Sequence, residues 1–173
     1  MADRPRILVE ARPGAGKTTA FLRLAERLRQ AGLSLAGFTT EEIRERGRRV
    51  GFAVESFSGE RGTLAHVSFD GPPRVGKYGV DLAEFERVAL PALGAASDVV
   101  LIDELGKMEL ASERFREAIE QMMDRPVAVA ATVQAGRHPF TDRLKRRCEV
   151  IKLTSANRDE LPSRLAERLG AAS

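Results

Sequence analysis

Short apolar runs alternate along this chain with longer segments in which apolar residues recur every three or four positions. Three runs are apolar without interruption, as strands buried on both faces of a parallel sheet are: 7–9, 99–102 and 127–131. Four longer segments carry helical stripes, which include Leu24, Phe85, Ile119 and Leu165. Strands that alternate with helices in this way predict a three-layer α/β fold with a mostly parallel sheet.

Glycine, proline and capping residues indicate where the helices begin and end. Gly32 suits the position after the first helix, because that position usually has a left-handed conformation. Asp81 can cap the second helix, and Pro91 must end or kink it because proline lacks the N–H donor. If Asp159 caps the last helix, Pro162 lies in its first turn and costs no hydrogen bond.

A region with a different pattern of apolar and polar residues interrupts this alternation of strands and helices. Residues 33–40 form the second expected strand, and the polar residues 39–42 stand at its end. Residues 50–57 and 63–69 then alternate between apolar and polar side chains, as half-buried strands do. We expect these two segments to form an antiparallel hairpin attached to the main sheet, which also receives a last short strand at 150–153.

The segment between the first strand and the first helix has the composition of a phosphate-binding loop. In Gly14-Ala15-Gly16-Lys17-Thr18, two glycines precede a lysine and a hydroxyl residue at the start of a helix. Such a loop surrounds phosphates with backbone N–H groups, its lysine reaches the β- and γ-phosphates, and its hydroxyl joins the Mg²⁺ shell. The positive end of the helix dipole points at the anion. The residues expected to bind nucleotide are Arg12, Pro13, Gly14, Ala15, Gly16, Lys17, Thr18 and Thr19.

One position departs from the full phosphate-loop pattern, because Ala11 stands where the pattern has glycine, five residues before Gly16. A Cβ there costs on the order of 1 kcal/mol or more if the backbone needs a positive φ, and almost nothing if φ is negative. We expect a negative φ, because a chain that keeps alanine at this position must accommodate its side chain.

A second segment, 71–78, has both glycines and the lysine at the same spacing, but it ends in Tyr78 instead of serine or threonine. Pro72 and Pro73 have no N–H to offer a phosphate. Tyr78 is too long to place its oxygen on Mg²⁺, and no helix is expected directly after Lys77. We therefore interpret the match as accidental, although Lys77 could still serve a ligand in another way.

Two acids directly follow the apolar run at 99–102. In phosphate-loop enzymes the first carboxylate at this point usually holds Mg²⁺, and a second one can orient or deprotonate the attacking water. Asp103 and Thr18 are therefore the expected metal ligands. Glu104 and Lys17 are the expected catalytic residues.

Other polar residues near the strand ends have more than one interpretation. Glu109 could be a further acid of the site or a capping residue before the helix expected at 111–123. Thr132 and Gln134 could sense the γ-phosphate or could be ordinary polar residues at a strand end. The only two histidines, His66 and His138, lack ligand spacing to each other and are expected to be structural. An arginine that neutralises transition-state charge could be Arg12, Arg44, Arg46, Arg48, Arg49, Arg137 or Arg143.

The composition, with 43% hydrophobic and 31% charged residues, is that of a globular protein. There is no apolar run of about 18 residues, and residues 1–6 lack the core of a signal peptide, so we expect a cytoplasmic protein without a membrane partner. Cys148 is the only cysteine, which excludes a disulfide within one chain. The formal charge of +3 is too balanced to indicate a nucleic-acid partner. We expect one domain, 1–173, that acts as a monomer.

Several motifs occur together in the order found in one known family. They are Arg12-Pro13-Gly14-x-Gly16-Lys17-Thr18, Gly37-Phe38-x-Thr40-Glu41-Glu42, Arg48-Arg49-Val50-Gly51-Phe52, Val75-Gly76-Lys77-Tyr78, Asp103-Glu104-x-Gly106-Lys107-Met108-Glu109 and His138-Pro139-Phe140. Over essentially its whole length the chain resembles the THEP-type nucleoside-triphosphatases, the relatives of cancer-related nucleoside-triphosphatase. The resemblance implies a P-loop NTPase fold akin to RecA-like ATPases. It also implies slow, Mg²⁺-dependent hydrolysis of ATP, GTP and other nucleoside triphosphates to the diphosphate, with little base preference.

Two other functions would use the same features of the sequence. A phosphotransferase, or kinase, that passes the γ-phosphate to a small molecule or a polynucleotide end needs the same loop, and residues 40–42 could hold its acceptor. Glu104 beside Asp103 favours activated water, and hence hydrolysis. A nucleic-acid-binding module could use the arginines of 44–49 and 143–147, but acidic neighbours and the 5% aromatic content argue against stacking on bases.

Overall fold

The computed structural model describes residues 4–170 of the chain. Its strands are β1 (Arg6–Ala11), β2 (Leu35–Glu45), β3 (Arg48–Ser56), β4 (Arg61–His66), β5 (Arg74–Val75), β6 (Tyr78–Val80), β7 (Val99–Leu105), β8 (Ala128–Gln134) and β9 (Glu149–Lys152). Its helices are α1 (Lys17–Gln30), α2 (Leu82–Gly94), the 3-10 helix η1 (Glu109–Ala111), α3 (Glu113–Met123), α4 (Pro139–Lys145) and α5 (Leu161–Gly170).

In the described part of the chain, nine strands form one sheet in the order β5-β6-β4-β3-β2-β7-β8-β1-β9. The half from β2 to β9 is parallel, and the half from β2 to β5 is antiparallel. This confirms the predicted α/β fold with a mostly parallel sheet and an added antiparallel hairpin. The antiparallel half is larger than expected, because the short strands β5 and β6 extend it beyond the β3–β4 hairpin, and residues 67–69 lie outside β4.

The predicted end of the second strand at residue 40 is wrong. Strand β2 continues through its polar residues to Glu45 and turns back at Arg46 and Gly47, which have φ angles of 51° and 76°. Thr40 lies opposite Val54 and Glu42 lies opposite Phe52 on β3. The polar half of β2 stays extended because β3 provides partners for its backbone, which no pattern within 33–42 could reveal.

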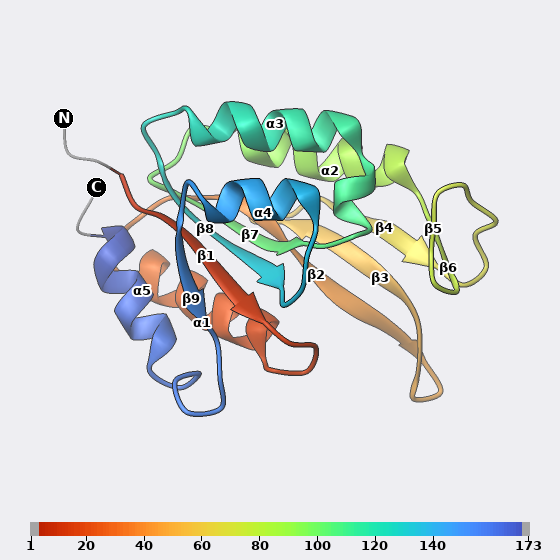
Figure 1. Cartoon of the computed structure of the whole chain (residues 1–173), viewed down its shortest axis with the longest axis horizontal. Coiled ribbons are helices and arrows are strands. Elements are labelled where there is room, and N and C mark those ends of the chain that lie inside the picture. The colour runs from red at the N-terminus through yellow and green to blue at the C-terminus, as the bar shows by residue number, and fades with distance from the viewer. Residues whose placement is uncertain (1–3, 171–173) are drawn as a thin grey trace.

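Helices cover both faces of the sheet (Figure 1). On one face, α1 and α5 pack Leu24 and Leu165 into a core with the apolar strands β1, β7 and β8. On the other face, α2, α3 and α4 bury Phe85, Ile119 and Leu144 in a second core. The buried helical stripes therefore account for the three layers. No helix among the described residues has the length and apolar character needed to cross a membrane.

Several of the predicted helix boundaries are confirmed. Gly32 follows the end of α1 with a φ of 83°, and the Asp81 carboxylate accepts a 3.0 Å hydrogen bond from the Glu84 N–H. Pro91 does not end α2, because the helix continues to Gly94. Pro162 does lie in the first turn of α5.

Three helix starts differ from expectation. Helix α3 begins at Glu113, because Ser112 accepts a 3.0 Å hydrogen bond from the Phe115 N–H and caps it. Helix α5 begins at Leu161, so Asp159 does not directly precede it. Helix α4 was not expected at all, since it is short; His138 caps it.

Candidate active site

The loop between β1 and α1 has the backbone of a phosphate-binding loop. Gly14 and Gly16 have φ angles of 79° and 89°, which a residue with a Cβ adopts only under strain. Helix α1 begins directly after them at Lys17, so its first N–H groups face the loop. Ala11 belongs to β1, is 2% exposed and does not have a positive φ, so alanine fits there as expected.

Four residues singled out in the sequence lie together at the mouth of this loop. The Lys17 ammonium and the Glu104 carboxylate form an ion pair of 2.8 Å, with both side chains about five-sixths buried. The Thr18 hydroxyl donates a 2.7 Å hydrogen bond to Oδ2 of Asp103. The contacts arise because β7 ends in the sheet close to β1, with only β8 between them.

Asp103 is fully buried at the end of β7. The Thr132 hydroxyl donates a 2.7 Å hydrogen bond to its other oxygen, Oδ1. Burial raises the pKa of the Asp103 carboxyl, and the hydrogen bonds from Thr132 and Thr18 oppose that rise. Thr132 therefore orients Asp103, and its buried hydroxyl is not aimed at a γ-phosphate.

Gln134 and Glu109 both reach the cleft beside Glu104. The Gln134 amide donates a 3.3 Å hydrogen bond to Oε1 of Glu104. Glu109 is 3% exposed, and its Oε2 accepts a 3.1 Å hydrogen bond from the Gly106 N–H. Burial, followed by the nearby charge of Glu104, raises the pKa of Glu109 to about 8. Of its two interpretations, the structure supports an acid in the site, because Ser112 caps α3.

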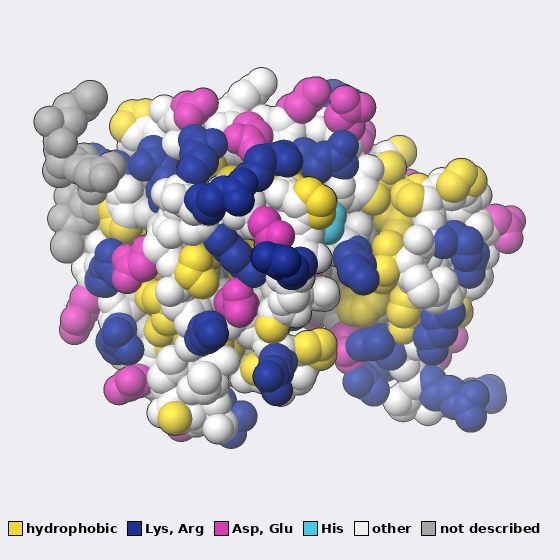
Figure 2. All heavy atoms as spheres, in the orientation of Figure 1, with side chains coloured by type: hydrophobic (Ala, Val, Ile, Leu, Met, Phe, Trp, Pro, Cys, Tyr) yellow, Lys and Arg dark blue, Asp and Glu magenta, His cyan; other side chains and the backbone are white. Residues whose placement is uncertain are grey.

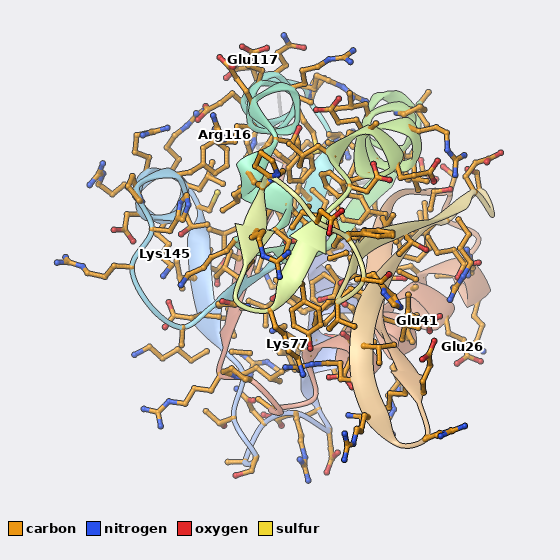
Figure 3. The ribbon with its side chains drawn as sticks, turned by 90° about the vertical axis from the view of Figure 1, so that its right-hand side faces the viewer. Glu26, Glu41, Lys77, Arg116, Glu117 and Lys145 are labelled. Atoms are coloured by element: carbon orange, nitrogen blue, oxygen red, sulfur yellow. The ribbon has the colours of Figure 1, made fainter. Side chains whose placement is uncertain are left out.

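A cleft of about 760 Å³ is lined on one side by Lys17, Thr18, Asp103, Glu104, Glu109 and Gln134. The opposite wall comes from β2, β3 and the β5–β6 turn, and Figure 2 shows the surface hollowed between these projecting strands and the rest of the molecule. Figure 3 looks from the side of the β5–β6 turn, with Lys77 near the centre and Glu41 on the β2–β3 ribbon. The expected loop residues that line the cleft are Pro13, Gly14, Gly16, Lys17, Thr18 and Thr19.

Two expected loop residues have other positions. Arg12 is exposed and its carbonyl accepts a 3.1 Å hydrogen bond from the Ala15 N–H, which closes the turn. Ala15 packs against the core beneath α1. Neither side chain lines the cleft.

The second Gly-Lys segment is not a phosphate loop. Strand β6, and not a helix, follows Lys77, whose ammonium lies 5.5 Å from the centre of the Tyr78 ring. His66 and His138 each accept a hydrogen bond from a nearby backbone N–H, that of Ser68 and Phe140 respectively. The described residues contain no group of three or more side chains arranged to hold a metal ion by themselves.

Sequence reasoning missed the roles of Arg49, Phe52 and Tyr78, which form part of the far wall of the cleft. The sequence placed all three in motifs of the resemblance, but it gave Arg49 no role beyond that of one arginine among several and treated Tyr78 as the residue that breaks a loop pattern. Their proximity depends on the pairing of β3 and β6 with β4, which the spacing along the chain does not express.

The model of a family described as NTPase matches residues 6–166. The chain is 42% identical over 161 residues to nucleoside-triphosphatase THEP1 of Thermotoga sp. (strain RQ2), with 90% of each chain covered. It is 39% identical over 171 residues to the cancer-related nucleoside-triphosphatase of Homo sapiens, covering 86% of this chain and 88% of the human one.

Two solved structures agree with this comparison. The solution structure of the human cancer-related nucleoside triphosphatase has a TM-score of 0.86 at 35% identity, with 98% of this chain and 99% of that chain covered. The crystal structure of THEP1 from Aquifex aeolicus has a TM-score of 0.84 at 34% identity, with 94% and 98% covered. The chain therefore belongs to the THEP1 family of nucleoside-triphosphatases.

Proposed function

We propose that this nucleoside-triphosphatase binds a Mg²⁺-nucleoside triphosphate at the loop after β1 and transfers the γ-phosphate to water. The observation that carries the proposal is the pair of contacts at the loop, Thr18 to Asp103 at 2.7 Å and Lys17 to Glu104 at 2.8 Å. They bring a phosphate-binding cation, two metal-binding oxygens and a candidate base to one point of a cleft large enough for the substrate.

Lys17 and the loop N–H groups bind the β- and γ-phosphates. The Lys17 ammonium forms an ion pair with the Glu104 carboxylate. A triphosphate carries more negative charge than one carboxylate, so it attracts the ammonium more strongly and releases Glu104 toward the attacking side of the γ-phosphate.

The oxygens of Thr18 and Asp103 fit Mg²⁺. Mg²⁺ prefers oxygen ligands and is usually held by one or two protein oxygens together with substrate phosphates and waters. The adjacent hydroxyl and carboxylate supply that set, and the described residues offer no all-protein cage that would compete with it. When bound, Mg²⁺ neutralises charge that develops on the phosphate oxygens.

Glu104 accepts the proton of the attacking water. The water oxygen forms a bond to the γ-phosphorus while the bond from that phosphorus to the β–γ bridging oxygen breaks, and the nucleoside diphosphate leaves. The hydrogen bond from Gln134 holds one Glu104 oxygen, so the other is free to face the water once Lys17 moves to the phosphates.

The charged surface supports a protein that works without nucleic acid. Arg44 and Arg49 both bond to Glu42, and Arg147 bonds to Glu120 and Asp124. Part of the charge of the arginine-rich segments is thus paired with neighbouring carboxylates, which weakens attraction to a phosphate backbone. We propose a monomer with a nucleoside triphosphate as its ligand.

Phosphate release from ATP, GTP, CTP and UTP, measured with Mg²⁺ and with a chelator, tests this function. We expect release only with Mg²⁺, and specificity constants within about tenfold, or roughly 1.4 kcal/mol of transition-state binding. Absence of release from all four nucleotides would contradict hydrolysis. A preference for one base of about a hundredfold or more would contradict the broad base tolerance.

A further inference from the structure

The far half of the cleft is an uncovered continuation of a buried sheet face. Phe38 on β2 packs its ring against phenylalanine rings of α2 and α3, at 5.6 and 5.7 Å between ring centroids. Because side chains alternate along a strand, Thr40 and Glu42 project from the same face farther along β2. Phe52 lies opposite Glu42 on β3. Thr40, Glu42 and Phe52 line the cleft.

The Thr40 hydroxyl has no hydrogen-bond partner among the described residues, although the residue is only 9% exposed. The hydroxyls of Thr18 and Thr132, at the other side of the cleft, are both hydrogen-bonded. The oxygen of this hydroxyl is not fully buried, so it is open to the cleft, where it can donate a hydrogen bond to a ligand atom or accept one from it.

The neighbouring wall combines aromatic surface with hydrogen-bonding groups. The Arg49 guanidinium donates to the Tyr78 hydroxyl at 2.9 Å and to Oε1 of Glu42 at 3.1 Å, and its carbon lies 5.3 Å from the centre of the Phe52 ring. The Phe52 and Tyr78 rings meet edge to face, with centroids 5.3 Å apart. The aromatic part of this wall can pack against a planar ring of a ligand, while the Arg49 guanidinium and the Glu42 carboxylate contact the polar edge of that ring.

This wall lies on the attacking side of the bound triphosphate. In the proposed function Lys17 binds the β- and γ-phosphates. Glu104, which is ion-paired with Lys17, then lies near the group that attacks the γ-phosphate. Glu104 lies near the end of β7, and in the sheet β7 stands between β2 and the strand that leads into the phosphate loop, β1. The nucleoside part of the triphosphate, which follows the α-phosphate, therefore extends away from this wall.

We propose that the far half of the cleft binds a nucleoside, which takes the place of water as an acceptor of the γ-phosphate. The inference rests on the proposed function, because it uses the same loop, Lys17 and Glu104. The base packs against Phe52, its polar edge meets Arg49 and Glu42, and a ligand oxygen or nitrogen pairs with the Thr40 hydroxyl. The charges on the wall are already paired, Glu42 with Arg49 and Arg44, which favours a neutral ligand over a phosphorylated one.

The transfer step balances without a further reactant. A sugar hydroxyl oxygen forms a bond to the γ-phosphorus, and the bond from that phosphorus to the β–γ bridging oxygen breaks. The hydroxyl proton passes to Glu104, and the nucleoside diphosphate leaves with the bonding electron pair. The products are a nucleoside monophosphate and a nucleoside diphosphate.

Binding is tested first, with the protein loaded with Mg²⁺ and ADP. Adenosine, guanosine, cytidine, uridine and thymidine are titrated against wild type, Thr40→Val and Thr40→Ser. At least one nucleoside should bind in the millimolar range or tighter, Thr40→Val should weaken it by about three- to tenfold, and Thr40→Ser should bind as wild type does. Thr39→Val is the matched control, because Thr39 projects from the opposite face of β2 and does not line the cleft.

Transfer is tested with ATP labelled in its γ-phosphate and the nucleoside that binds best. We expect label in the nucleoside monophosphate, with much less after Phe52→Ala, while ATP affinity and nucleoside-free phosphate release stay within about twofold of wild type. The inference is overturned if no nucleoside binds, if Thr40→Val and Thr39→Val behave alike, or if a bound nucleoside gains no label. Loss of ATP affinity in Phe52→Ala would also overturn it, because the wall would then hold the base of the triphosphate. Failure of the proposed hydrolysis would be seen separately, as absent phosphate release without nucleoside.

Discussion

The hydroxyl of Thr18 donates a 2.7 Å hydrogen bond to one oxygen of Asp103, which lies 85 positions farther along the chain. Thr132 donates a bond of the same length to the other oxygen. The carboxylate is therefore held between the start of α1 and the end of β8 before any ligand arrives. A metal-binding oxygen that is oriented in advance needs little reorganisation when the nucleotide and its cation enter.

The two Gly-Lys pairs allow a direct comparison. Lys17→Ala should abolish triphosphate binding, because the phosphates lose the cation at the loop. Lys77→Ala should leave the affinity for Mg²⁺-ATP within a few-fold of wild type, since Lys77 packs on the Tyr78 ring and does not line the cleft. Calorimetric titration of both variants is the measurement. Binding that survives Lys17→Ala and is lost in Lys77→Ala would overturn the assignment of the phosphate loop.

The roles of the two adjacent acids can be separated by amide substitutions. Glu104→Gln keeps the size of the side chain but cannot accept a proton, so nucleotide should still bind while turnover falls by roughly 10²–10⁴-fold. Asp103→Asn should instead shift the Mg²⁺ dependence of turnover to higher concentrations, because a neutral amide is a weaker ligand. Single-turnover phosphate release across a Mg²⁺ titration measures both effects. Near-normal release from Glu104→Gln would exclude Glu104 as the base and leave Glu109 as the next candidate.

Ala11→Gly restores the usual loop pattern but should destabilise the protein. Ala11 is buried in β1 without a positive φ, so glycine removes a packed methyl group and adds freedom to the unfolded chain. We expect a loss of roughly 1–2 kcal/mol in the free energy of unfolding, measured by denaturant titration. A higher melting temperature together with tighter nucleotide binding would show that alanine is strained there.

Glu109 should make the stability of the ligand-free protein depend on pH. Its pKa is raised from 4.5 to about 8 in the folded protein. Between these values the folded state holds a proton that the unfolded state has lost, so stability falls as pH rises through this window and levels off above it. The slope for one proton is about 1.4 kcal/mol per pH unit.

Glu109→Gln provides the comparison for this effect, since it cannot titrate. Urea unfolding of wild type and Glu109→Gln, without nucleotide or metal and between about pH 5 and about pH 8, should show a steeper fall for wild type. Parallel profiles for the two proteins would mean that the Glu109 carboxyl is already ionised across this range.

Local spacing in the sequence was enough to predict the loop, the acids at the end of β7 and most of the helices. The two glycines lie in the turn directly before Lys17, and the two acids directly follow the apolar run of β7, so each pattern lies within a few consecutive residues. A helical stripe such as that of Leu24 also repeats within a few residues. The roles assigned to Thr18, Lys17, Asp103 and Glu104, the single domain and the monomer stay predictions for the experiments to test.

Contacts between distant segments decided the rest. The polar residues from Thr40 to Glu42 lie within a strand, because β3 pairs with them, and this pairing cannot be predicted from the local sequence. Thr132 bonds to Asp103, whereas Gln134, two residues farther along β8, lines the cleft, and only the folded sheet brings Asp103 to Thr132. The wall around Arg49 likewise exists only after β3, β4 and β6 have paired. Spacing along a chain determines turns and stripes, whereas strand pairing depends on the whole apolar core and brings together side chains that no local pattern connects.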